Sequence, residues 1–169
     1  MNRVVQIIIF LLVLISCNKE VVNTPNPENG DSEFISAVDI SRYPEISNVN
    51  PTFYDLDGNQ EDFLTILKEN GINAVRLRLW VNPLNEHSGF NEVKQFSQTL
   101  KTKGFKTWLT LHYSDTWADP GHQEIPLQWQ GISFNALKDS VYNYTKKVVD
   151  EIQPDYIQIG NEINPGLLH

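Results

Sequence analysis

The sequence predicts an α/β fold in which the strands of a parallel sheet alternate with helices. Short apolar segments alternate along the chain with segments whose apolar residues recur at helical spacing. Alternation of this kind makes consecutive strands parallel and places the helices outside the sheet. The predicted strands are residues 34–41, 74–81, 106–115 and 155–162, and the predicted helices are residues 60–70, 90–103 and 134–152.

Capping residues set the predicted ends of the helices. Gly71 and Gly104 follow the first two helices, where glycine commonly ends a helix. Asn91 and Ser133 are the expected N-caps of the second and third helices. Residues 42–59 are expected to be irregular. The inward face of the third helix is predicted to hold Phe134, Leu137, Val141, Tyr144 and Val148.

The second strand has an unusual face. Apolar residues at 75, 77 and 79 alternate with Arg76, Arg78 and Trp80. A strand that lies between helices normally has two apolar faces, so two arginines on one face need buried partners or a water-filled site. The alternative is an edge strand with a solvated face, which fits poorly with the apolar helices on either side.

Polar residues follow each of the later strands. They are Asn82, the segment from His112 to Asp115, and the pair Asn161-Glu162. Functional residues at the carboxyl ends of successive strands are typical of the (β/α)8 barrel, of which four strands are half. Dinucleotide binding is not expected, because no glycine-rich motif follows the first strand.

Glu162 is the candidate catalytic residue. A carboxylate at the mouth of a buried strand is costly unless it is paired or hydrogen-bonded. In a half-desolvated cleft its pKa rises, so it can donate a proton near neutrality. The alternative is that Glu162 only caps the turn.

The amino-acid composition limits the classes of binding partner that are expected. The net charge is −8 with no cluster of Lys or Arg, which argues against nucleic acid. Residues 116–131 form a long loop rich in Trp, Pro and Gly, which indicates a binding or lid role. The Asp55–Asn59 segment is interpreted as a turn, because Ile66 stands where a calcium loop ends in Glu. We expect no metal and no cofactor in this segment.

The N-terminus resembles that of a bacterial lipoprotein. Residues 1–16 combine Arg3 with an apolar run, residues 7–15, that is too short to span a membrane. Leu14-Ile15-Ser16-Cys17 resembles a lipobox, in which the cysteine carries the lipid; a stray cysteine is the alternative. Residues 17–33 are interpreted as a flexible tether. We therefore expect a secreted lipoprotein of the cell envelope, attached to the outer membrane through its lipid and facing the periplasm or the surface.

From Phe34 onward the chain resembles glycoside hydrolase family 53, the endo-β-1,4-galactanases. Five separate motifs support this resemblance: Val38-Asp39-Ile40-Ser41, Phe53-Tyr54-Asp55, the segment from Val75 to Pro83, His112-Tyr113-Ser114-Asp115 with Trp117-Ala118-Asp119-Pro120-Gly121, and the segment from Gln158 to Asn164.

The resemblance implies a (β/α)8 barrel, residues 34–169 supplying about its first four units. The implied activity is endo-hydrolysis of β-1,4-galactosidic bonds in galactan or arabinogalactan side chains of pectin, by a retaining mechanism with two carboxylates. Glu162 would be the acid/base, Asn161 would bind the sugar 2-hydroxyl, and Arg78 would keep the nucleophile ionised. The remaining implied active-site or sugar-contacting residues are Asp39, Arg76, Trp80, His112, Tyr113, Asp115 and Trp117.

The resemblance places the nucleophile, a Glu, at the end of strand seven. We therefore expect this chain to be a truncated product or a fragment that is inactive alone, and to be monomeric. One alternative is a surface-anchored, non-catalytic glycan-binding lipoprotein. Another is a β-mannan or β-glucan substrate, because nothing in the residue chemistry distinguishes galactose from its epimers.

The lipid anchor predicts the fate of a Cys17→Ala variant. In a bacterial host the wild-type chain should be cleaved before Cys17 and partition with membranes, whereas the variant should stay unprocessed or soluble. Labelling with a palmitate analogue, followed by fractionation, checks this. An alanine variant that still takes up the label would place the anchor elsewhere.

Overall fold

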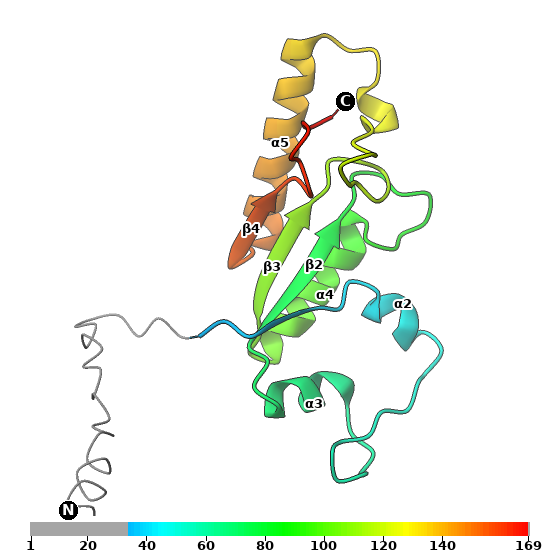
Figure 1. Cartoon of the computed structure of the whole chain (residues 1–169), viewed down its shortest axis with the longest axis vertical. Helices are drawn as coiled ribbons and strands as arrows, with labels where there is room; N and C mark the ends of the chain where they lie inside the picture. Colours follow the sequence, from blue (N-terminus) through cyan, green and yellow to red (C-terminus); the bar gives the residue numbers. More distant parts are fainter. Residues whose placement is uncertain (1–33, 169) are drawn as a thin grey trace, which may run out of the picture. The chain divides into compact units, whose positions relative to one another are not determined.

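A four-stranded parallel sheet organises residues 34–168, the part of the chain that the computed structural model describes (Figure 1). The expected signal peptide, the expected tether and Cys17 lie outside the described residues. The strands follow one another in sequence order, β1 (Ala37–Asp39), β2 (Ala74–Leu79), β3 (Lys106–Leu111) and β4 (Tyr156–Ile159). The helical elements between them are α2 (Tyr43–Ser47), α3 (Phe63–Glu69), α4 (Phe90–Thr102), η1 (Leu127–Trp129) and α5 (Phe134–Ile152).

Strand β2 is an interior strand. It pairs in parallel with β1 on one side and with β3 on the other. The edge-strand alternative for the arginine-bearing segment is therefore wrong. The register sets Asp39 beside Arg76, and Arg78 beside Thr110, so that side chains of one face form continuous rows across the sheet.

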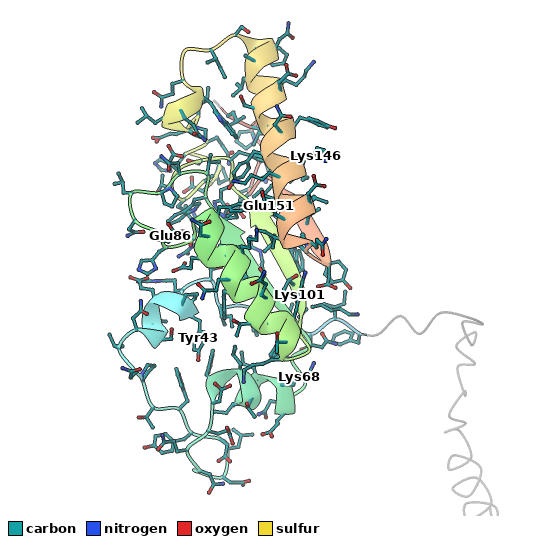
Figure 2. The ribbon with its side chains drawn as sticks, turned by 180° about the vertical axis from the view of Figure 1, so that it is seen from behind. Tyr43, Lys68, Glu86, Lys101, Lys146 and Glu151 are labelled. Carbon is teal, nitrogen blue, oxygen red and sulfur yellow. The ribbon has the colours of Figure 1, made fainter. Side chains whose placement is uncertain are left out.

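The hydrophobic core lies between the sheet and its helices. Figure 2, seen from behind, shows α4 and α5 lying side by side over the strands. Odd-numbered positions of β2 and β3 point into this layer, and Leu77, Leu79, Leu109 and Leu111 are at most 1% exposed. The opposite face of the sheet is left for Arg76, Arg78 and their neighbours.

Lysine side chains tie the helices to each other and to the ends of neighbouring elements. Lys94 pairs with Glu151 across α4 and α5 at 2.8 Å. Lys101 donates to the carbonyl of Ile152 at 2.9 Å, which satisfies an orphan carbonyl at the end of α5. These contacts fix the two helices that cover β2, β3 and β4.

The helix ends agree in part with the sequence-based expectations. Gly71 and Gly104 have φ of +84° and +79°, as helix-ending glycines do. Ser133 caps α5 by accepting a hydrogen bond from the Ala136 amide at 3.3 Å. Helix α4 begins at Phe90 as predicted, but the expected N-cap Asn91 is wrong, since Gly89 takes that position.

Other differences have local causes. Asp62 accepts a hydrogen bond from the Thr65 amide and starts α3 at Phe63, three residues later than expected. Residues expected to be irregular include the short helix α2, which has a proline in its first turn. Phe134 is 79% exposed and not inward, because it stands in the first turn of α5, beyond the sheet. The strands also end before their polar residues, which leave the ladder.

Within residues 34–168, no helix has both the length and the apolar character needed to cross a membrane.

The core predicts a clear contrast between two leucines. Leu77 is 1% exposed in β2, whereas Leu84 lies fully exposed in the following loop. Leu77→Ala should lower the free energy of unfolding by about 2–5 kcal/mol, because it leaves a cavity in the core. Leu84→Ala should change it by less than about 0.5 kcal/mol. Denaturant unfolding of the chain measures both, and equal losses would place Leu77 outside a packed core.

Candidate active site

The carboxyl ends of the strands bring together residues that are distant in sequence. The Arg76 guanidinium, from β2, binds the Asp39 carboxylate, from β1, at 2.5 Å. Its other terminal nitrogen donates to the Asn161 side-chain oxygen, beyond β4, at 2.9 Å. One arginine thus joins three of the four strand ends.

Asp39 is the anionic partner of this arginine. Its other carboxylate oxygen accepts hydrogen bonds from the Ser41 amide at 3.0 Å and the Ser41 hydroxyl at 2.6 Å. Burial alone would raise the pKa of Asp39, but the hydrogen bonds from Ser41 and Arg76 outweigh it and hold the pKa below its ordinary value. The Asp39–Arg76 pair is therefore ionic and largely self-neutralised.

Arg78 has a different environment. Within residues 34–168 it takes part in no ion pair; its Nε donates to the Ser88 hydroxyl at 2.9 Å. Its guanidinium lies 4.9 Å from the centre of the Trp80 ring and 5.9 Å from that of Trp117. Burial lowers the pKa of Arg78, which nonetheless stays charged at neutral pH. Arg78 is thus a half-buried cation that lies against two indole rings and can donate hydrogen bonds to a carboxylate.

His112 directly follows β3, at the same carboxyl edge of the sheet, and is 1% exposed. Its Nδ1 accepts a hydrogen bond from the Ala118 amide at 3.0 Å, so the proton of the neutral ring is on Nε2. Nε2 is buried and has no partner among the described residues. Burial, together with the positive charges of Arg76 and Arg78, lowers the pKa of His112 to about 4. His112 is therefore a neutral hydrogen-bond donor at physiological pH.

Asn161 is held on every side. It is 3% exposed, its side-chain nitrogen donates to the Ala118 carbonyl at 2.8 Å, and its backbone carbonyl accepts from Gln123 at 2.8 Å. Its side-chain oxygen accepts from Arg76, and the Ala118 carbonyl takes one of its two side-chain N–H groups. The remaining N–H faces Glu162, whose carboxylate lies 3.5 Å away.

Glu162 itself is exposed and lightly held. Within the described part of the chain, that 3.5 Å contact is the one hydrogen bond of its carboxylate, so nothing supports the turn-capping alternative. Its backbone has a φ of +50°, and Gly160 before it has +82°. A side chain on Gly160 would bring a Cβ within 2.4 Å of the Ile163 methyl group, so this bend requires glycine.

The loop after β3 provides an exposed aromatic wall, Trp117, which is 41% exposed beside His112. Asp115 was expected in that wall, but its oxygens accept hydrogen bonds from the Asn82 amide at 2.9 Å and the Leu127 amide at 2.8 Å. Asp115 therefore supports the site by joining two loops.

The expectation that Tyr113 contacts sugar is wrong. Its side chain is fully buried, and its hydroxyl is 2.6 Å from the Thr145 hydroxyl of α5. Tyr113 lies beyond the end of β3, with a φ of +53°, and its ring packs on the side that α5 covers, 6.5 Å from the ring of Tyr144.

Sequence reasoning did not identify four residues that hold this site together: Ser41, Ser88, Ala118 and Gln123. Ala118 and Gln123 act through loop contacts to or from the backbone, which leave no periodic signal. Ser41 could have been identified from the sequence, because a serine two residues after Asp39 can hydrogen-bond back to that carboxylate. Within residues 34–168, no group of three or more His, Cys, Asp or Glu is placed to hold a metal ion.

Comparison with known proteins gives one family. Residues 35–169 match the family described as glycosyl hydrolase family 53. The endo-beta-1,4-galactanase of Bacillus subtilis is 34% identical over 152 residues, which cover 82% of this chain and 35% of that protein. The probable arabinogalactan endo-beta-1,4-galactanase A of Aspergillus terreus is 40% identical over 121 residues, covering 69% of this chain and 35% of that protein.

Solved structures agree. The GH53 catalytic domain of Ignisphaera aggregans matches with a TM-score of 0.76 and 38% identity, over 84% of this chain and 43% of that one. A fungal beta-1,4-galactanase matches with a TM-score of 0.73 and 35% identity, over 79% of this chain and 42% of that one. The four parallel strands thus match part of a (β/α)8-barrel catalytic domain, and the chain spans less than half the length of these relatives.

The environment of His112 predicts its titration. Its pKa is about 4 in the folded chain and about 6.5 when unfolded, so the unfolded state binds the proton first as the pH falls. The free energy of unfolding should therefore decrease from about pH 6.5 to about pH 4, with no contribution above that window. NMR titration of the ring should give a midpoint near 4, and His112→Gln should remove this part of the pH dependence. A midpoint near 6.5 would contradict the buried, neutral histidine.

Proposed function

The chain belongs to glycosyl hydrolase family 53, and on that premise we propose that it supplies the acid/base half of a retaining endo-β-1,4-galactanase site. Glu162 is the acid/base in this proposal. The nucleophile is a second carboxylate from strand seven of the complete barrel, as the family resemblance implies. The substrate is the β-1,4-galactan or arabinogalactan of pectin, in keeping with the names of the relatives.

The proposal rests on the observation that two charged side chains at the carboxyl edge of the sheet, Glu162 and Arg78, form no ion pair among residues 34–168. Glu162 makes only one long contact, and Arg78 is a desolvated guanidinium without an ion pair in residues 34–168. A retaining glycosidase needs a carboxyl that can both give and take a proton, and a second carboxylate that stays ionised. Glu162 suits the first role, and Arg78 suits the stabilisation of the second.

The proposed hydrolysis has two steps. The nucleophile's carboxylate oxygen bonds to the anomeric carbon while the glycosidic C–O bond breaks, and the departing oxygen takes the Glu162 proton. Water then attacks the anomeric carbon and gives its proton to Glu162, and the nucleophile leaves as a carboxylate. Each group ends the cycle as it began.

The same carboxyl edge of the sheet carries groups that can bind a sugar. Trp117 presents an exposed ring on which the apolar face of a galactose can stack. The buried Nε2–H of His112 is a donor without a partner in the described residues, and Asn161 keeps one N–H that faces Glu162. In the proposal this last N–H binds the 2-hydroxyl of the sugar beside the acid/base.

The position of the enzyme is part of the proposal. A lipid on Cys17 and a polar tether would hold the catalytic domain at the cell envelope, where polymeric galactan is met. The lipobox-like segment Leu14-Ile15-Ser16-Cys17 supports this, and the Cys17→Ala experiment tests it.

The acid/base role predicts the kinetics of Glu162→Gln. The test protein is a complete catalytic domain in which residues 35–169 replace the matching part of the Bacillus subtilis galactanase. Its rate on natural galactan should fall by about 10²–10⁴-fold in the variant, because protonation of the leaving oxygen is lost. A substrate with an activated aryl leaving group should lose much less in the first step. Added azide, which needs no base, should restore turnover and give a β-galactosyl azide.

Glu69→Gln is the matched control, because Glu69 ends α3, away from the carboxyl ends of the strands. It should leave both rates unchanged. Equal losses on both substrates in Glu162→Gln, with a lower melting temperature and no azide rescue, would remove Glu162 from the mechanism. A wild-type domain that binds galactan without cleaving it would instead favour the glycan-binding alternative.

A further inference from the structure

Gln123 is a buried amide that the proposed chemistry does not use. It lies in the loop between β3 and α5 and is 2% exposed. Its Nε2 donates to the Asp119 carbonyl at 3.1 Å, within the loop, and to the Asn161 carbonyl at 2.8 Å, beyond β4. Its Oε1 is buried and has no partner among the described residues.

The bond to Asn161 acts directly on the backbone of Glu162. The carbonyl of Asn161 and the amide of Glu162 belong to the same planar peptide group. Holding that carbonyl therefore fixes the plane from which the Glu162 side chain departs. Glu162 needs such help, because its own carboxylate has only the 3.5 Å contact and its φ is +50°.

Three contacts together hold Asn161 and its peptide group with Glu162 in place. Arg76 and the Ala118 carbonyl hold the Asn161 side chain at 2.9 and 2.8 Å, and Gln123 holds its backbone. Among the described residues, the Gln123 contact is the one that restrains the peptide group itself. The same loop also supplies the Ala118 amide to His112, so it joins the floor of the site to the Glu162 strand end.

Filling space does not by itself explain glutamine at this position. An apolar side chain of similar length would avoid the cost of a buried oxygen without a partner, but it would leave two backbone carbonyls without their donor. Glutamine keeps the cost of that oxygen and in return donates to the Asp119 and Asn161 carbonyls, of which the second belongs to the peptide group of Glu162.

We propose that Gln123 is a positioning residue for Glu162, which it orients by clamping the Asn161–Glu162 peptide from the loop after β3. This rests on the proposed acid/base role of Glu162. The clamp lets an exposed carboxyl hold one direction without forming strong bonds of its own.

Gln123→Met tests the clamp, because methionine has a similar length but no donor and no unpaired oxygen. In the chain itself, the ¹⁵N–¹H signal of the Glu162 amide should shift, and the melting temperature should fall modestly, because the Asp119 and Asn161 carbonyls lose a donor. In the complete catalytic domain, kcat on galactan should fall by about 10–100-fold with KM little changed, since misplacement of a reacting group by about 1 Å can cost 10²-fold. The activated aryl substrate should lose much less.

Asn73→Leu is the matched control. Asn73 also donates from a side-chain amide to a backbone carbonyl, that of Phe34 at 2.7 Å, but it precedes β2 and so lies at the opposite end of the sheet. It should lower the melting temperature without moving the Glu162 signal or the ratio of the two rates. Gln123→Glu, which keeps the shape and replaces the donor with an acceptor, serves if the methionine variant does not fold.

The outcomes separate the two proposals. An unmoved Glu162 signal, an unchanged kcat, or equal losses on both substrates would overturn the positioning role. A wild-type catalytic domain without galactanase activity would overturn the proposed function, while the shift of the Glu162 signal would still decide whether Gln123 clamps the peptide.

Discussion

The contact of Arg76 with Asp39 and Asn161 is the interaction on which the rest of the site depends. It spans 85 residues between Arg76 and Asn161 and joins the first, second and fourth strands at their carboxyl ends. A guanidinium on the inner face of a sheet is costly unless its charge and its N–H groups are satisfied. Asp39 supplies the charge and Asn161 supplies an amide oxygen, so the arginine becomes a fixed link between the ends of three strands.

Because of this contact, the two arginines on one face of β2 have different environments. Arg76 is neutralised by Asp39, whereas Arg78, two residues later, has only Ser88 and two indole faces among the described residues. Burial, and after it the positive charges of Arg76 and Arg78, lowers the pKa of His112 and keeps its ring neutral. Of these two arginines, Arg78 is therefore the one without an ion pair among residues 34–168, and His112 can donate a hydrogen bond beside it without adding a charge.

Sequence patterns predicted the parts of this structure that repeat. The alternation in residues 74–81 placed Arg76 and Arg78 on one face, and the helix–strand rhythm gave the order of the sheet. The resemblance assigned Tyr113 to the sugar wall, but this residue has left the strand with a φ of +53° and is buried against α5, which no alternation of the strand predicts. Gln123 and Ala118 could not be found this way, because their roles depend on bonds between a loop and a distant strand end, which have no period and no characteristic spacing.

Those unpredicted contacts suit the acid/base role proposed for Glu162. A carboxyl in a strong ion pair stays ionised and so has no proton to give to a leaving group. Glu162 has no ion pair among residues 34–168, while its neighbour Asn161 is buried and bonded through side chain and backbone. The network thus holds the residue before Glu162 and reaches it through the planar peptide, so that in the proposed mechanism the carboxyl can give and take a proton without disturbing the contacts that hold its neighbour in place.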